Sequence, residues 1–321
     1  MKFKTRTWLL IAAALIVLGA ALFALVMTVV DWDFMALSTT EYETNTHEVS
    51  EEFSGISLFS READVVFLPS EDTVCRVVCN ERVKQNHTVS VIEGVLTVRM
   101  VDEEKWYDRV EIFNFGSPKI EVYLPATHYY ELSMLVSSGD VKVPDNFHFE
   151  KAKIETGAGD VSFAASLAGA LEIRTGTGDI ALEGVRAGAL LLHASSGEIS
   201  AKRVNCAGAF TVEVGTGNVT AEDAYCAEFT SHGGTGELHL KNVMCGGKLL
   251  VERSTGDVTL YACDAKELYI TTSTGDVVGT LLSEKQFAVS TNTGKVEVAH
   301  TTAGGTCEIN TDTGDIKISL S

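Results

Sequence analysis

Apolar and polar residues alternate along most of this chain, and one recurring corner interrupts the alternation. The segment LEIRTGTGDIALE at residues 171–183 shows the unit: an alternating run, a glycine followed by an acid, and a second alternating run. Alternation with period two is typical of β-strands that bury one face. The corner glycine recurs ten times at intervals of 19 or 20 residues, at Gly139, Gly159, Gly178, Gly197, Gly217, Gly236, Gly256, Gly275, Gly294 and Gly314.

The apolar positions of all repeats coincide when they are counted from the corner glycine. The residue two places after the glycine is apolar in all ten copies, and the residue five places before it is apolar in nine. A unit this short cannot bury its own apolar face, so it needs like neighbours on both sides. We therefore predict an all-β fold, a parallel β-solenoid of about ten coils with one repeat of 19–20 residues in each. A propeller is disfavoured because each blade needs about 40 residues.

The same pattern divides the chain into three parts. Residues 1–30 are predicted to hold a cytoplasmic stub and a transmembrane anchor, residues 31–130 an all-β opening section without the repeat, and residues 131–321 the repeat solenoid. The opening section has strand-like runs such as DVVFLP and KIEVYLP and is expected to cover the first coil. At the other end only DIKISLS follows the last corner, so its polar residues are expected to shield the end of the stack.

One segment near the amino terminus is apolar throughout. Trp8 to Val30 form 23 positions without a charge or a proline, about 35 Å as a helix, which is enough to cross a bilayer. A cleaved signal peptide is the alternative, but its apolar core usually has only about 7 to 15 residues. Lys2, Lys4 and Arg6 precede the span and DWDF follows it, so we expect a single-pass membrane protein with a cytoplasmic amino terminus and an extracellular carboxy-terminal part.

The overall charge restricts the classes of partner. The chain has 44 acidic and 25 basic residues, a formal net charge of −19. Binding to phosphate backbones or anionic lipid surfaces depends on lysine and arginine displacing counterions. No nucleic-acid partner is therefore expected, and the membrane is expected to be contacted through the helix.

The acid after the corner glycine has two interpretations. A short polar side chain can accept hydrogen bonds from the turn backbone, which accounts for any single copy. Carboxylates stacked coil upon coil could instead hold calcium or another cation, since hard cations prefer oxygen ligands. We favour the turn interpretation and expect no cofactor. The cation candidates are Asp140, Asp160, Asp179, Glu198, Glu237, Asp257, Asp276 and Asp315.

Three of the seven cysteines share one position of the repeat. Cys206, Cys226 and Cys245 each lie nine residues after a corner glycine, where other copies place alanines such as Ala168 and Ala187. This exchange of small residues predicts a buried ladder of free thiols. A disulfide between neighbouring coils and a metal site are the alternatives.

The chain lacks signatures of catalysis. It has no GxSxG or HExxH sequence, its histidines occur singly, and the even spacing of the corners leaves no room for long loops over a cleft. Paired threonines before several corners would suit an ice-binding face, but Ala194, Val214, Gly233 and Arg253 break that pattern. We expect that the protein is not an enzyme.

The corners RSTGDVTL, TTSTGDVVG and TDTGDIKIS, with the run from FSGISL through KIEVYLP to VSSGDVKV, resemble the bacterial putative-adhesin family of unknown-function domains, over roughly residues 46–321. The resemblance implies a β-solenoid of the cell envelope. It suggests a membrane-anchored, outward-facing binding or structural module with an envelope protein or a glycan as its ligand. The alternatives are a sensor or regulatory partner of an envelope-stress signalling system, and a polysaccharide-active β-helix enzyme.

Overall fold

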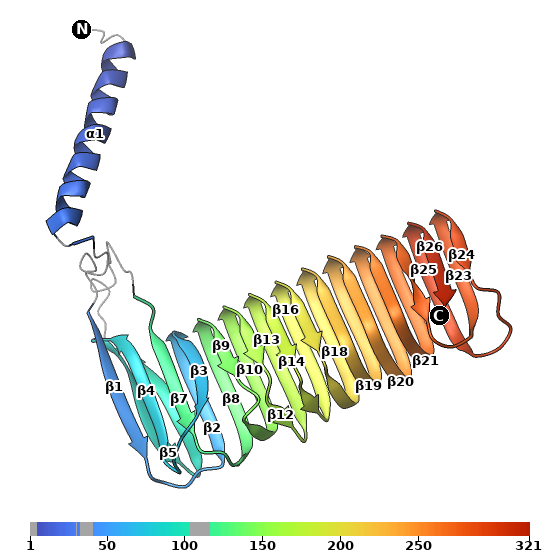
Figure 1. Ribbon diagram of the computed structural model, residues 1–321, viewed down its shortest axis with the longest axis horizontal. Helices are drawn as coiled ribbons and strands as arrows, with labels where there is room; N and C mark the ends of the chain where they lie inside the picture. Colours follow the sequence, from blue (N-terminus) through green and yellow to red (C-terminus); the bar gives the residue numbers. More distant parts are fainter. Residues whose placement is uncertain (1–4, 30, 33–40, 103–115) are drawn as a thin grey trace.

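The computed structural model describes residues 5–29, 31–32, 41–102 and 116–321. One helix, α1 (Thr5–Val29), precedes the β-structure and stands apart from it in Figure 1. Its segment Trp8–Val29 has a mean hydropathy of 3.0 and is long and apolar enough to span a membrane. Lys2 and Lys4, which contribute to the predicted orientation, lie outside the described residues.

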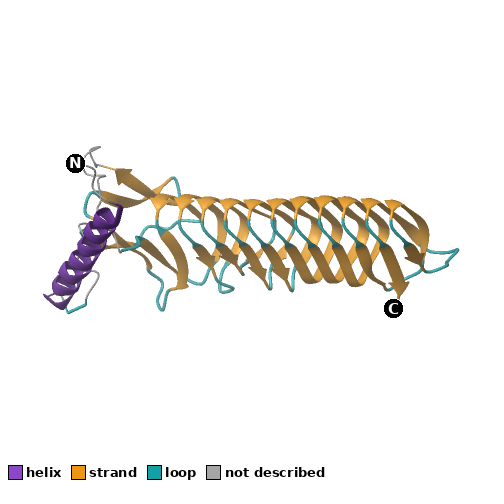
Figure 2. Ribbon diagram, turned by 90° about the horizontal axis from the view of Figure 1, so that it is seen from above, coloured by secondary structure: helices purple, strands orange, loops and turns teal. Residues whose placement is uncertain are grey.

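The rest of the described chain forms one continuous sheet of 26 strands, wound into a rod (Figure 2). The opening strands are β1 (Tyr42–Val49), β2 (Gly55–Glu62), β3 (Asp64–Pro69), β4 (Cys75–Arg82), β5 (Gln85–Ile92), β6 (Val95–Asp102) and β7 (Lys119–Leu124). The strands of the repeats are β8 (His128–Ser138), β9 (Val141–Val143), β10 (His148–Ala158), β11 (Val161–Phe163), β12 (Ser166–Leu167), β13 (Ala170–Thr177), β14 (Ile180–Glu183), β15 (Arg186–Ala187), β16 (Ala189–Ser196), β17 (Ile199–Lys202), β18 (Asn205–Thr216), β19 (Val219–Thr235), β20 (Leu238–Thr255), β21 (Val258–Thr274), β22 (Val277–Leu281), β23 (Lys285–Thr293), β24 (Val296–Val298), β25 (Gly305–Thr313) and β26 (Ile316–Leu320).

The repeats stack in parallel register, which confirms the predicted β-solenoid. The strand after each corner pairs with its counterpart in the next coil, so that Val141 lies opposite Val161 and Val161 opposite Ile180. The strand before each corner does the same, with Ile154 opposite Ile173. Equivalent positions therefore form continuous ladders along the rod, as the in-phase pattern predicts.

The interior of the rod consists of these apolar ladders. The residue two places after the corner glycine is at most 1% exposed in every coil except that of Gly294, where Val296 is 45% exposed. Phe210 and Phe229 of adjacent coils meet edge to face, with ring centroids 5.3 Å apart. Each buried aliphatic or aromatic side chain contributes about 1.5–3 kcal/mol, so stability depends on neighbouring coils being present.

The stack begins before the first corner glycine. β2 pairs in parallel with β8 on one side and with β6 on the other, and β3 lies between β9 and β7. Ala63 occupies the corner between β2 and β3 and Asp64 takes the acid position, so a count of glycines misses this coil. β5 pairs with β6 and β4 with β7, both antiparallel, and so close this end of the rod. The division of the chain at residue 130 stays a prediction.

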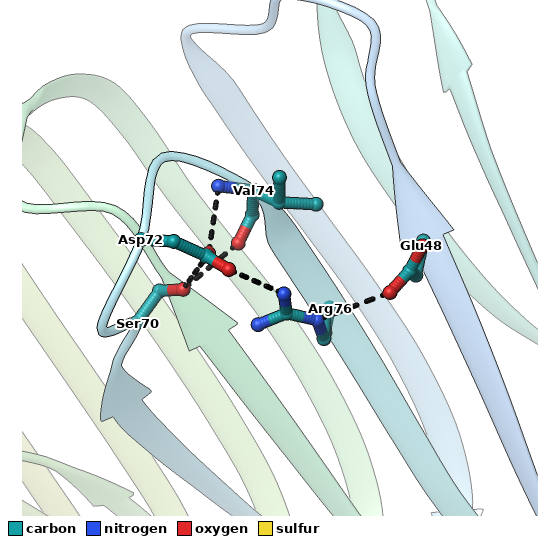
Figure 3. Close-up of polar contacts among 5 residues, drawn as sticks. All are labelled: Glu48, Ser70, Asp72, Val74 and Arg76. Carbon is teal, nitrogen blue, oxygen red and sulfur yellow. Dashed lines mark hydrogen bonds and ion pairs between the residues drawn. The ribbon is translucent and has the colours of Figure 1, made fainter.

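Polar contacts tie β1 to the turn between β3 and β4 (Figure 3). Asp72 accepts hydrogen bonds from Ser70 Oγ at 2.8 Å and from the backbone N–H of Val74 at 3.0 Å, and it pairs with Arg76. The guanidinium of Arg76 also donates to Glu48 on β1, with Nε 3.2 Å from Oε1. The hydrogen bond from Arg76 is the largest influence that lowers the pKa of Asp72 to about 2.

The order of coils at the far end differs from the order along the chain. β25 and β26 pair with β21 and β22 on one side, and with β23 and β24 on the other. The outermost coil of the described rod is thus β23–β24, and the prediction that DIKISLS ends the stack is wrong. Residues 299–304 connect β24 to β25 and let the chain return into the stack. Lys295 takes the acid position in the outermost coil, so its side chain offers no acceptor to a further coil.

Candidate functional site

The corner glycines are required for two separate reasons. Nine of the ten have φ between 130° and 151°, a conformation that L side chains rarely adopt, and Gly294 in the outermost coil is the exception. A Cβ added at any of the ten would lie only 1.9–2.2 Å from a carbonyl oxygen of the neighbouring coil. The glycine therefore provides both the bend and the close contact between coils.

The acids after the corners link each coil to the next. Oδ1 of Asp160 accepts the backbone N–H of Asp179 at 2.8 Å, and Asp179 in turn accepts that of Glu198 at 2.7 Å. Asn218 makes the same bond to the N–H of Glu237 at 2.9 Å, so a neutral amide is sufficient for it. The predicted cation candidates that act as acceptors in this way are Asp140, Asp160, Asp179, Asp257, Asp276 and Asp315.

All eight cation candidates lie in one row along the rod, with one acid in each coil. Glu198 and Glu237 only donate their backbone N–H in these bonds. Within the described residues, no three of these carboxylates lie close enough together to ligate one metal ion. The observed geometry is that of a turn-stabilising ladder, and a cation between coils stays a prediction.

A buried polar cluster lies instead in the opening section. Cys79, Glu81 and His87 have potential ligand atoms within 4.8 Å of one another, and each is at most 5% exposed. His87 Nδ1 lies 2.6 Å and its backbone nitrogen 2.7 Å from Glu81 Oε2, while Asn45 Nδ2 lies 2.9 Å from Oε1. Ser60 Oγ contacts His87 Nε2 at 3.1 Å. Cys79 and Glu81 lie two residues apart on β4 and His87 lies on β5, a spacing that matches no metal or catalytic motif, so the sequence did not predict this cluster.

Burial and hydrogen bonds set the protonation of this cluster. Burial opposes the charged form of Glu81, but hydrogen bonds from His87 and Asn45 outweigh it, so the pKa of Glu81 is lowered. Burial, with a smaller effect from the charge of Glu81, raises the pKa of Cys79 to about 12. In this protonation state the cluster is held together by the hydrogen bonds of Glu81 with His87 and Asn45. The three side chains could hold a metal ion only if the Cys79 thiol lost its proton on binding.

An open hollow lies on the outward face of the central coils. Two imidazole–carboxylate pairs line it, from the neighbouring strands β16, β18, β19 and β20 of four successive coils. His193 Nδ1 lies 3.1 Å from Glu213 Oε2, and His232 Nδ1 lies 3.0 Å from Glu252 Oε2. The lining also includes Gly233 and Arg253. The hollow therefore offers both donors and acceptors to a polar ligand.

Arg253 is the unusual residue of this hollow. It occupies an inward position whose neighbour in the next coil is Thr272, and it is only 4% exposed. Its side chain fills the space of the side chain that Gly233 lacks, since a Cβ there would lie 2.0 Å from Nη1. Nη2 donates to Ser231 Oγ at 3.1 Å, whereas Nε and Nη1 have no hydrogen-bond partner. Burial lowers the pKa of Arg253 to about 10.

Residues 53–209 and 205–321 each match the family Toastrack DUF4097. The chain belongs to this family. The two matches together run from the opening strand β2 through the repeats, which confirms the resemblance found from the corner motifs. No curated protein matches the chain.

Several solved structures are similar over most of their length. A protein of Parabacteroides distasonis ATCC 8503 described as a putative adhesin is 13% identical, with 88% of this chain and 98% of that chain covered and a TM-score of 0.47. A putative adhesin of Bacteroides fragilis NCTC 9343 is 14% identical, with coverages of 86% and 97% and a TM-score of 0.39. A second P. distasonis protein, described as a putative lipid binding protein, is 14% identical, with coverages of 87% and 97% and a TM-score of 0.41.

Proposed function

We propose that this protein is a non-enzymatic module of the cell envelope. In this proposal α1 anchors the chain in the membrane with its amino terminus in the cytoplasm, and the solenoid extends outward as a rod that binds or supports an envelope component. The membrane-spanning length of α1 and its high mean hydropathy support the anchor. The excess of acidic residues supports a rod that stays away from anionic lipid headgroups.

The observation that carries the proposal is the continuous stacking of the coils. The corner glycines and acids are engaged in contacts between coils, so the outward-facing strand positions are what the rod presents to a partner. Among these positions the hollow at Gly233 is the best-defined contact point, because two partly exposed imidazole–carboxylate pairs, His193 with Glu213 and His232 with Glu252, line it. These groups suit the hydroxyl and carbonyl groups of an envelope glycan.

The topology is tested by adding protease to protoplasts that express the full chain. The proposal expects the β-solenoid to be degraded and a small fragment containing α1 to remain. Lysed protoplasts serve as the control for cleavage at the cytoplasmic side. Full protection of residues 31–321 in intact protoplasts would overturn the orientation.

Binding is tested by sedimenting isolated cell-wall polysaccharide with the full chain held in lipid nanodiscs. We expect co-sedimentation that weakens at least several-fold in His232→Ala, which removes one imidazole of the hollow. It should be unchanged in the matched control His239→Ala, which removes an imidazole paired with Glu237 outside the hollow. Empty nanodiscs control for binding of lipid. No co-sedimentation of the wild-type chain would contradict a glycan-binding module, and release of soluble sugar fragments would show an enzyme instead.

A further inference from the structure

The three cysteines of the ladder are equivalent in sequence but not in geometry. Cys206 lies opposite Cys226, and Cys226 lies opposite Cys245, on the paired strands β18, β19 and β20. The sulfur atoms of Cys226 and Cys245 approach to 3.4 Å. The sulfur of Cys206 contacts the carbonyl oxygen of Ala209 at 3.3 Å instead. One pair of the ladder is therefore brought together.

We propose that Cys226 and Cys245 are a disulfide site that cross-links two central coils when the protein meets a disulfide oxidant. Residues directly opposite on paired strands are about 4.8 Å apart, inside the usual range of Cα separations for a disulfide. The sulfurs need to move closer by only about 1.4 Å to reach bonding distance. The inference stands on these contacts and does not depend on the proposed function.

A regular ladder of parallel side chains rarely offers the torsion that a disulfide needs, but here the ladder is irregular. The pairing of β19 with β20 shifts register between Cys226 and Phe229, directly after the first cysteine. The pairing of β20 with β21 shifts between Cys245 and Lys248, directly after the second. These bulges give the backbone freedom to turn the two side chains toward each other.

The two thiols are also the most accessible of the seven. Cys226 is 8% and Cys245 7% exposed, whereas the other five are at most 2% exposed. Cys245 lines an open hollow together with Asp264, Ser283 and Lys285. The hydrogen bond from Cys245 lowers the pKa of Cys226 and outweighs the effect of burial. Cys226 is thus the thiol that more readily forms a thiolate.

The reaction is thiol–disulfide exchange with a small disulfide such as oxidised glutathione. The thiolate of Cys226 attacks one glutathione sulfur, the glutathione disulfide bond breaks, and the other glutathione leaves as a thiolate. Cys245 then loses its proton, and its sulfur attacks Cys226 Sγ and expels the second glutathione. The two protein thiols are oxidised to one disulfide, and the glutathione disulfide is reduced to two thiols.

The test uses the full chain in detergent micelles, first reduced and desalted and then incubated with oxidised or with reduced glutathione. After denaturation and alkylation, the reduced sample should carry a label on all seven cysteines and the oxidised sample on five. Peptide mapping of the oxidised wild type should recover one cross-linked pair, Cys226 with Cys245. The oxidised form should also unfold at a higher temperature, and a reductant should reverse this shift.

Single substitutions separate this pair from its neighbour in the ladder. Cys226→Ser and Cys245→Ser should each abolish the cross-link, whereas the matched control Cys206→Ser should keep it. Peptide mapping of the wild type needs no variant, so a variant that fails to fold does not remove the test. Seven labelled cysteines after oxidation, stable glutathione adducts without a cross-link, or a cross-link between Cys206 and Cys226 would each overturn the inference.

Discussion

Replacing the corner glycine Gly217 by alanine should disrupt the coil-to-coil contact. Its φ is 144°, and an added Cβ would lie 1.9 Å from the carbonyl oxygen of Gly197 in the preceding coil. Holding a side chain in such a conformation costs about 1–3 kcal/mol. The contact is far shorter than van der Waals distance and involves backbone, so separating the coils adds about 1–3 kcal/mol more. We expect Gly217→Ala to lower the free energy of unfolding by about 2–6 kcal/mol.

A second corner of the coil supplies the matched control. Gly184 has φ of 69°, and an added Cβ would meet nothing within 4 Å. The equivalent position of other coils holds Arg203, Asp223, Asn242 and Ala262, all with φ between 51° and 54°. Gly184→Ala should therefore cost only about 1–2 kcal/mol, the ordinary penalty of a left-handed conformation.

Urea unfolding followed by circular dichroism measures the global effect of both substitutions. Hydrogen exchange read by mass spectrometry should show lost protection in peptides of β18 and β19 for Gly217→Ala, and little change there for Gly184→Ala. Because a solenoid can open locally, the exchange data decide where the stack has loosened. Equal destabilisation by the two substitutions would refute the reasoning that close contact between coils requires the corner glycine.

Three other perturbations test separate parts of the structure. Deleting residues 256–274 removes one full repeat and should leave a folded rod that is one coil shorter. Deleting only nine or ten residues there should cause aggregation, which size-exclusion chromatography would detect. If both deletion variants elute as folded monomers, the coils do not stack in phase. The double substitution Asp257→Asn and Asp276→Asn should barely change the melting temperature, with or without millimolar calcium, because Asn218 makes the same hydrogen bond as these acids. A large calcium-dependent rise of the melting temperature in the wild type alone would instead support a cation site. The lowered pKa of Glu81 adds stability above the unfolded value of about 4.3, and this stability is lost as the pH falls through the folded pKa. Glu81→Gln should therefore be less stable than the wild type at pH 7, and the difference should disappear in strong acid. A difference in stability that does not depend on pH would contradict a charged Glu81.

Much of this fold could be predicted from the sequence because its constraints are local and repeated. The corner glycines mark positions that admit no side chain, and the apolar residue two places later marks an inward position, so ten copies in phase leave little choice but a stack. The ladder of Cys206, Cys226 and Cys245 follows from the same register. Because every coil has the same inward positions, the three cysteines are buried at equivalent positions, as the repeat predicts.

Only the tertiary structure decided which coil lies beside which. The coil of Gly314 lies between those of Gly275 and Gly294, and the coil at Ala63 lies against that of Gly139. All coils have apolar residues at the same inward positions, so exchanging two neighbouring coils keeps every ladder apolar. The sequence pattern therefore does not specify the order of the coils. The tertiary structure also decided two contacts between side chains. Arg253 packs over Gly233 of the preceding coil, and Glu81 on β4 hydrogen-bonds to His87 on β5. Such pairings are set by packing between strands, which a periodic pattern read along one chain does not contain.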